Sequence, residues 1–381
     1  MSQLQQSAPT GPGSESPAPS VRQLTFQWAG GPAIPVLSVL IALSLGGLFV
    51  LASGNSPVAA YAALFQGAFG SPYDVTETIV STVPLVLTAL SVAIAFRTGL
   101  FNIGAQGQLL VGALAAGWAG AQFAALPGPI LMPIVVVFGI GGGAFYGGIV
   151  GVLKALRGVN EVITTIMLNY TIVFVMHWLL QAGPMTAQNA LGTPASTPIG
   201  AGARLPVIIP NEVVLFSRLH AGVILAAIAV VFFWFLLWRT PLGYRLRAVG
   251  LGARAAAQAG IDPRRHIILV MAIAGGFAGL GGMIEVTGLF GRVYDGFASS
   301  YGFDAIAVAL LGKNSPLGIV AAALLFGAFV HGGAYMQSHA GISSNLVSII
   351  QAFVLFVIAA EALVRAIVGR RRHRKPVEAI A

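Results

Sequence analysis

Side-chain amides recur at short spacing in one apolar region of the chain. Asn102, Gln106 and Gln108 follow Phe101 within the segment FNIGAQGQ. Asn102 and Gln106 are four residues apart, a spacing that places two side chains on one helix face. The nearby glycines favour a broken helix with freed backbone groups. Amides that donate and accept hydrogen bonds beside an aromatic ring predict the wall of a substrate pathway, and the alternative is a short turn whose amides join helices.

A second polar group is a stripe on a later apolar segment. Glu161, Thr165 and Asn169 follow one another at intervals of four residues. They would therefore share one face of a helix and line a cavity. In the alternative interpretation, Glu161 stabilises the helix start through the helix dipole, and the other two side chains join helices.

A third candidate, Asp304, stands near the start of the short apolar segment 303–312. This segment is too short to cross a membrane and precedes the sequence KNSPLG, which should break any helix. It is therefore expected to be a re-entrant half-helix, which is tolerated only inside protein or beside a cavity. Asp304 would either cap this half-helix or hold a ligand group at its end.

The composition determines which elements position these groups. Hydrophobic residues make up 57% of the 381 residues and charged residues only 8%, with a mean hydropathy of +0.87. Soluble domains carry about 25% charged residues. An all-α integral membrane protein is therefore expected. The chain has no cysteine, which excludes disulfides, thiolate metal sites and cysteine nucleophiles.

About ten membrane elements are expected, in two groups of about five on either side of the loop 182–218. A helix needs about 20 apolar residues to cross the hydrocarbon core. Nine stretches meet this length, and segment 303–312 adds the short element. The predicted spans are 34–53, 78–96, 102–123, 130–153, 162–181, 220–238, 267–289, 316–336 and 346–368.

Charge placement predicts the domain limits and the orientation. Residues 1–32 are polar, with no basic stretch leading into an apolar one, and are expected to be a disordered tail and not a cleaved signal peptide. The membrane domain is 33–368. Loop 239–265 holds six arginines and one acid and is expected to be cytoplasmic, with 182–218 external. The basic tail 369–381 is interpreted as a cytoplasmic lipid anchor and not a nucleic-acid site, so both termini are expected in the cytoplasm.

Several chemistries are not supported by the sequence. The nearest match to a phosphate-binding loop, at Gly312 and Lys313, has Ala307 in place of the first glycine and Asn314 in place of Ser or Thr. The histidines lack metal-ligand spacing. Intramembrane acids are few and no chain of Asp, Glu and His indicates a proton relay. No catalytic residue, metal or bound cofactor is expected in this chain.

Glycines at fourfold spacing predict close helix packing. The ladder consists of Gly139, Gly143, Gly147 and Gly151, and the span 267–289 is also glycine-rich. Small residues let helix backbones approach closely in membranes. We interpret these glycines as scaffold and not as phosphate-binding loops.

The loop 239–265 has features of a docking element. Its alanine-rich part, 255–259, favours a short helix, which Gly260 and Pro263 would end. A short basic helix on the cytoplasmic side could bind a soluble partner. An ordinary positively charged cytoplasmic loop is the alternative.

Four segments in order carry a resemblance to a known family. They are FNIGAQGQ (101–108), NEVITTIMLNY (160–170), TPLGYRLRAVG (240–250) and FDAIAVALLG (303–312). The chain resembles the permease subunits of bacterial nucleoside ABC importers over about residues 35–368. These permeases belong to a larger family that also serves simple sugars and branched-chain amino acids.

The resemblance implies an assembly in the bacterial inner membrane. A second permease copy or a related permease would complete the pathway, and an extracytoplasmic binding protein or lipoprotein would deliver the substrate. Separate ATPase subunits would bind ATP and Mg and would dock on about 244–261. The coupling residues that it implies are Tyr244, Arg245, Arg247, Gly250, Ala256 and Gly260. The acidic residue usual in such docking motifs is absent from the alanine run here.

The resemblance to nucleoside permeases agrees with the candidate residues. A nucleoside is neutral, with a planar base and a hydroxyl-rich sugar, and Phe101, Asn102, Gln106 and Asn169 offer stacking and amide pairing. A simple sugar needs similar groups and remains an alternative. An amino acid would need fixed charges. An ion-coupled secondary transporter would need a buried carboxylate network, which the sequence does not indicate.

Overall fold

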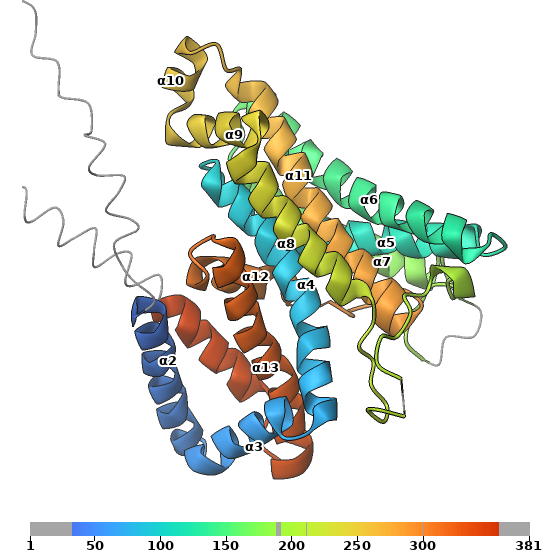
Figure 1. The fold of residues 1–381 in the computed structure, drawn as a ribbon, viewed down its shortest axis with the longest axis vertical. Coiled ribbons are helices and arrows are strands. Elements are labelled where there is room, and N and C mark those ends of the chain that lie inside the picture. Colours follow the sequence, from blue (N-terminus) through green and yellow to red (C-terminus); the bar gives the residue numbers. More distant parts are fainter. Residues whose placement is uncertain (1–32, 188–191, 211, 299, 358–381) are drawn as a thin grey trace, which may run out of the picture.

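The computed structural model describes residues 33–187, 192–210, 212–298 and 300–357, and these residues form helices and loops without a β-strand (Figure 1). Isolated bridges occur only in the loops, as between Val207 and His220. The all-α class is therefore confirmed. The α-helices are α2 (Ala33–Ala52), α3 (Pro57–Phe69), α4 (Pro72–Arg97), α5 (Ala105–Gln122), α6 (Gly128–Arg157), α7 (Glu161–Gln181), α8 (Gly222–Arg239), α9 (Pro241–Leu251), α10 (Ala253–Gln258), α11 (Pro263–Ile284), α12 (Tyr301–Leu311), α13 (Pro316–Ala340) and a last helix Asn345–Val357. A 3-10 turn, Ala201–Ala203, and a π-helical turn, Glu285–Phe290, complete the set.

Six of these helices are long and apolar enough to cross a membrane: α4, α6, α7, α8, α11 with its π-helical turn, and α13. Each coincides with a predicted span, as α2 and α5 also do. The short element 303–312 is present as α12. The total of about ten membrane elements and their division into two groups stay predictions.

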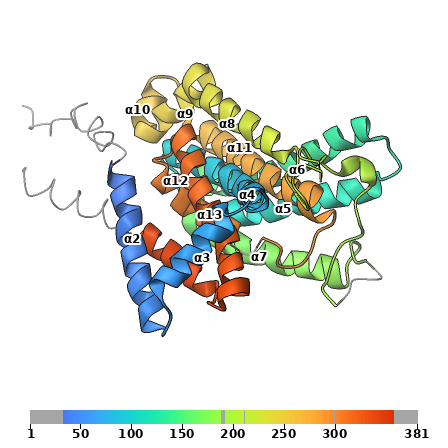
Figure 2. The same cartoon turned by 60° about the horizontal axis from the view of Figure 1, so that its bottom comes forward.

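Helix α3 is an element that the sequence analysis missed. Its 13 residues are too few to cross a bilayer, so a search for long apolar spans leaves them as a loop. Ser56 caps its first turn and Pro57 begins it, which is a common start for a helix. Figure 2 shows α3 between α2 and α13.

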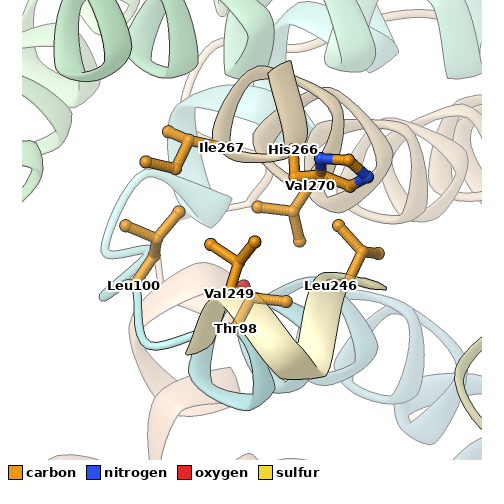
Figure 3. A pocket seen from close by; sticks show the side chains of 7 residues that line it. All are labelled: Thr98, Leu100, Leu246, Val249, His266, Ile267 and Val270. Carbon is orange, nitrogen blue, oxygen red and sulfur yellow. The ribbon is translucent and has the colours of Figure 1, made fainter. Parts of the chain in front are cut away.

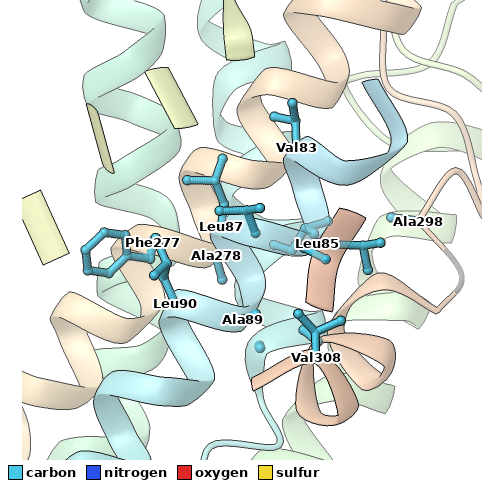
Figure 4. Close-up of a cluster of buried hydrophobic side chains, with 14 of the residues drawn as sticks. Val83, Leu85, Leu87, Ala89, Leu90, Phe277, Ala278, Ala298 and Val308 are labelled. Carbon is cyan, nitrogen blue, oxygen red and sulfur yellow. The ribbon is translucent and has the colours of Figure 1, made fainter. Parts of the chain in front are cut away.

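The core is built around α4 and α11. Both are largely buried, which agrees with helices that are apolar on all sides. Leu85, Leu87 and Leu90 of α4 meet Phe277 and Ala278 of α11 within one apolar cluster (Figure 4). Helix α12 also contacts α4 and contributes Val308 to this cluster.

The close packing predicted at the glycine ladder of α6 is confirmed, and its partner is α11. A Cβ atom added at Gly143 would collide with the carbonyl oxygen of Gly275 and would lie 2.7 Å from Gly279 Cα. At Gly151 it would lie 2.8 Å from Ile268 Cα. The two backbones are thus in contact, which only glycine permits.

The outer faces of α7 and α8 are apolar and uncovered. Tyr170 and Phe174 of α7, and Ile228 and Val231 of α8, all expose more than half of their surface. A soluble protein rarely exposes patches of this extent. Together with the six long apolar helices, these faces indicate a protein that passes through the membrane several times.

Helices α9 and α10 lie together at the upper end of α8 and α11 in Figure 1, and the described parts of the loop 182–218 lie at the other end of these two helices. Thr240 caps α9 through a bond from Gly243 N–H, and Pro241 begins the helix. The predicted short alanine-rich helix is confirmed as α10, and Gly260 follows it with φ of +79°. The predicted tails 1–32 and 369–381, and the end of the last predicted span, lie outside the described residues.

Candidate functional site

The break between α4 and α5 differs from the prediction. Gly99 adopts a φ of +74°, and α5 begins only at Ala105. Asn102 therefore lies in the loop before α5, while Gln106 lies inside that helix. The prediction that the two share one helix face is wrong, because the loop after the Gly99 turn continues through Gly104 and Asn102 lies within it.

Asn102 and Gln108 form a reciprocal amide pair in the buried core. Asn102 Nδ2 donates to Gln108 Oε1 at 2.9 Å, and Gln108 Nε2 donates to Asn102 Oδ1 at 3.1 Å. Asn102 Nδ2 also donates to Ser91 Oγ of α4 at 3.1 Å. Both amides are fully enclosed. This network joins α4, the loop and α5, so in this conformation it has the helix-joining role that was the alternative interpretation.

Gln106 caps the start of α12. Gly302 N–H donates to Gln106 Oε1 at 2.7 Å, and Gln106 Nε2 donates to the Ala298 carbonyl. The first N–H groups of a helix lack partners within the helix. The residue before α12, Ser300, makes no side-chain cap bond. The side-chain amide of Gln106, which belongs to α5, therefore caps α12 instead.

Asp304 lies inside the first turn of α12 and not at its cap position. Its carboxylate accepts a hydrogen bond from the Ser300 hydroxyl at 2.8 Å. The expectation that Asp304 itself caps the helix is thus corrected: the side-chain cap comes from Gln106. An acidic side chain in the first turn still agrees with the positive end of the helix dipole.

The predicted stripe of α7 is present and faces inward. Thr165 and Asn169 are buried, and Glu161 forms an ion pair with Lys154 at 2.7 Å. The Asn169 side chain accepts from Gly107 N–H at 2.9 Å and donates to the Ile103 carbonyl at 3.0 Å. Gly107 lies in the first turn of α5, so Asn169 caps α5 from α7.

We expect Asn169→Leu to lower the thermal unfolding midpoint of the detergent-purified protein. Loss of the amide leaves the N–H of Gly107 and the carbonyl of Ile103 without partners. Each unsatisfied buried group costs about 1–3 kcal/mol. Thr171→Leu on the uncovered side of α7 is the matched control, because its hydroxyl bonds only within its own helix. An equal midpoint for the two variants would contradict a capping role for Asn169.

Phe101 is the candidate pathway residue with the most accessible side chain. It remains 38% exposed and packs edge-on against Phe96, with ring centroids 4.8 Å apart. The structure thus brings Asn102, Gln106, Gln108 and Asn169 together around the start of α5 and leaves Phe101 at the edge of this group.

Helix α9 packs onto the break between α4 and α5. Leu246 and Val249 face Thr98 and Leu100 across a small apolar contact that residues 266–270 of α11 complete (Figure 3). Gly250 lies against the backbone of Thr98: an added Cβ would be 2.7 Å from Thr98 Cα. A displacement of α9 would therefore also move the loop that holds Asn102.

The six predicted coupling residues divide into outward and inward groups. Tyr244, Arg245 and Gly260 are exposed and Arg247 is half-buried. Gly250 packs on Thr98, and Ala256 is buried. These last two residues hold the α9–α10 unit on the fold, whereas the outward group offers the surface on which a partner could dock.

An ion pair near the opposite end was not predicted. Arg218, from the loop before α8, binds both carboxylate oxygens of Glu77 in α4, with Nε at 3.1 Å from each. Glu77 is almost fully buried, whereas the Arg218 side chain is 53% exposed. The bond to Glu77 raises the pKa of Arg218 above its ordinary value.

Two more polar groups are buried beside this pair. Glu285 begins the π-helical turn after α11 and is 2% exposed. His220 is fully buried, and burial lowers its pKa to about 4, so the imidazole is neutral at physiological pH. One signal in the sequence could have identified Glu285: it is the single acidic residue within the predicted span 267–289.

These features define a multi-pass membrane subunit whose helix ends are fixed by buried amides and whose basic α9–α10 unit is accessible. Comparison with known proteins agrees. A family model described as the permease component of branched-chain amino acid transport systems matches residues 75–359. The chain belongs to this permease family.

Several relatives are similar over almost their whole length. The guanosine ABC transporter permease protein of Bacillus subtilis is 38% identical over 342 residues, covering 90% of this chain and 97% of the relative. The nucleoside ABC transporter permease protein of Lactococcus lactis is 38% identical over 91% of this chain and 95% of its own length. The glucose ABC transporter permease protein of Haloferax volcanii is 39% identical, with coverage of 91% and 93%. No solved structure matches.

Proposed function

We propose that this chain is the membrane-spanning subunit of an ATP-driven importer that takes up nucleosides. The observation that carries this proposal is 38% identity, over nine-tenths of the chain, to two permeases named for guanosine and for nucleosides. The segments FNIGAQGQ and NEVITTIMLNY, on which the resemblance rests, form the buried amide group around α5. The substrate is neutral, in keeping with a group made of amides.

A simple sugar is the second candidate substrate. The permease named for glucose is as similar to this chain as the two nucleoside permeases. Sugars and nucleosides both present hydroxyl groups to amides and aromatic rings. The difference between them therefore depends on a few side chains and has to be measured.

The proposed assembly contains separate ATPase subunits, a second permease and an extracytoplasmic binding protein. The chain contributes no ATP-binding motif of its own, and ATP and Mg belong to the ATPase. The α9–α10 unit faces the cytoplasm of the bacterial cell, with both termini on the same side. This orientation is supported by the arginines of 239–265, because cytoplasmic loops carry an excess of Lys and Arg.

Within this assembly the predicted pathway residues have two kinds of role. Phe101, Glu161 and Asp304 keep some accessible surface and are proposed to line the pathway. The amides Asn102, Gln106, Gln108 and Asn169, with Thr165, fix the helix ends that shape it. Opening of the pathway would exchange some of these internal hydrogen bonds for bonds to substrate.

Charge reversal on α9 tests the docking surface. We expect Arg245→Glu combined with Arg247→Glu to reduce the amount of ATPase that co-purifies with the tagged chain by at least about tenfold. Arg245 is exposed and Arg247 half-buried. A glutamate in their place would face the acidic groups of the partner, and like charges across an interface cost several kcal/mol. The control is Arg204→Glu with Arg292→Glu, two reversals at the opposite end. Undiminished co-purification of the α9 variant would place docking elsewhere.

The substrate class is tested on proteins captured from the native host. The tagged chain is purified in mild detergent and the accompanying proteins are identified by mass spectrometry. The proposal predicts an ATPase and a solute-binding protein. Titration of that binding protein with guanosine and other nucleosides should give tight binding, with glucose much weaker. The reverse order of affinity would favour the sugar importer.

A further inference from the structure

Near the π-helical turn, buried polar atoms lack hydrogen-bond partners. Among the described residues, three buried side-chain atoms lack a hydrogen-bond partner: His220 Nε2, Glu285 Oε2 and Asn314 Oδ1. The first two adjoin the same turn. An added Cβ at Gly288, within that turn, would lie 2.6 Å from three atoms of the His220 ring. Unpaired buried polar groups are costly and rare in native proteins, and π-helical turns are frequent at functional sites.

The two unpartnered atoms differ in hydrogen-bonding character. His220 Nδ1 accepts from Gly222 N–H at 3.1 Å, so the proton of the neutral ring lies on Nε2. Nε2–H is therefore a donor without an acceptor. The free oxygen of Glu285 is an acceptor without a donor. A hydroxyl group both donates and accepts, so a ligand with neighbouring hydroxyls could satisfy both atoms.

Arg218 stands two residues before His220, in the loop that leads into α8. Its positive charge acts on both Glu285 and His220. Its hydrogen bonds, however, go to Glu77, and half of its side chain is exposed. The Glu77–Arg218 pair has no net charge. The remaining acidic group is Glu285, whose carboxyl oxygens accept hydrogen bonds from hydroxyl groups, which favours a neutral ligand that carries hydroxyls.

The same group adjoins the candidate pathway. The π-helical turn contacts helix α5, whose first turn holds Gln106. Gly302 of α12 donates its N–H to Gln106. Helix α5 thus connects the π-helical turn with the amide group and with the start of α12. Ends of short helices inside a membrane protein are common places for substrate groups.

We propose that Glu285 and His220 form a site for the vicinal hydroxyl groups of the transported solute, with Arg218 as its cover. When Arg218 moves outward, the Glu285 carboxyl group accepts hydrogen bonds from two neighbouring hydroxyls, and His220 Nε2–H donates to one of their oxygens. Acidic side chains recognise ribose hydroxyls in this way in nucleotide-binding folds. The inference rests on the proposed function, and its ligand chemistry is shared by the ribose of a nucleoside and by a sugar.

The test uses the complete complex in proteoliposomes with ATP inside and a saturated binding protein outside. Uptake of guanosine is compared with uptake of 2′,3′-dideoxyguanosine, which lacks the two hydroxyls. Glu285→Gln should lower kcat/KM for guanosine at least about tenfold, the scale of one lost hydrogen bond. The dideoxy analogue should change by less than about twofold, because a site built for hydroxyls gains nothing from a ligand without them.

Two further variants make the result specific. His220→Asn keeps an acceptor for the Gly222 N–H but removes the Nε2–H donor. It should also narrow the difference in kcat/KM between guanosine and its dideoxy analogue. Glu212→Gln makes the same chemical change as Glu285→Gln on the exposed loop. It should leave the difference in kcat/KM between the two nucleosides unchanged. Equal losses for guanosine and its dideoxy analogue would assign Glu285 a structural role and overturn the proposal, as would the absence of any loss.

The outcome is separable from that of the proposed function. If the unaltered complex carries glucose and not guanosine, the nucleoside assignment fails, and glucose is then compared with 2-deoxyglucose in the same variants. Selective loss of glucose uptake in Glu285→Gln would support the hydroxyl site. Unchanged selectivity in the variants, whichever solute is carried, would overturn it.

Discussion

Gly143→Leu is expected to prevent the protein from being purified as a folded species. The added side chain would enter the space occupied by the Gly275 carbonyl and the Gly279 backbone. Helices α6 and α11 make an extensive contact here, so they would have to separate along much of their length. Overpacking of a close-packed interior costs about 1–3 kcal/mol when neighbours can shift, and more when they are backbone atoms. The measurement is the monodisperse fraction after size-exclusion chromatography in mild detergent.

Gly141→Leu provides the matched control in the same helix. A Cβ at Gly141 meets nothing within 4 Å, so its leucine would point into open space on the outer face. This variant should purify as the unaltered protein does. If both variants purify equally well, α6 and α11 do not pack through the ladder. If neither variant can be purified, the loss comes from replacing a glycine anywhere in α6 and not from its contact with α11.

Arg218→Met is expected to destabilise the protein more than any substitution on the exposed surface. It leaves the carboxyl group of Glu77 buried without a counter-charge. Removal of one partner of a buried ion pair costs about 3–5 kcal/mol. Because the guanidinium is half exposed and screened by solvent, we expect about 2–4 kcal/mol here. The measurement is the thermal unfolding midpoint in detergent.

The double variant separates the pair from its parts. Arg218→Met with Glu77→Leu removes both charges, and apolar replacements of a buried pair are often neutral or stabilising. It should therefore unfold at a higher temperature than Arg218→Met alone. Arg292→Met, near the same end and stacked on Tyr294, should have little effect. A double variant less stable than either single one would contradict the pairing of Glu77 with Arg218.

The sequence predicted the long elements well because a membrane imposes a simple requirement on them. A run of about 20 apolar residues is visible without knowledge of its neighbours. Helix α3 lacks that length, and the π-helical turn continues the apolar pattern of α11, so neither could be recognised from pattern alone. The smooth glycine face of α6 was predictable because the spacing alone defines it, whereas its partner α11 was not.

The side chains of the candidate site were harder to interpret. The sequence singled out Asn102, Gln106 and Asn169, and the structure buries all three. The partners of Gln106 and Asn169, however, are backbone groups of other elements. Gly302, for example, lies 196 residues beyond Gln106. Likewise, Arg218 reaches Glu77 across 141 residues of chain. Local spacing carries no information on such pairings, so capping between helices and the buried ion pair required the three-dimensional arrangement.

The most direct test of the proposed function is nucleoside uptake by the reconstituted complex under two energy sources. Proteoliposomes containing the chain, its co-purified partners and the binding protein are supplied either with ATP or with an ion gradient alone. We predict guanosine uptake that requires ATP and persists when an uncoupler removes the gradient. Uptake driven by the gradient without ATP, and abolished by the uncoupler, would contradict the importer and identify an ion-coupled transporter.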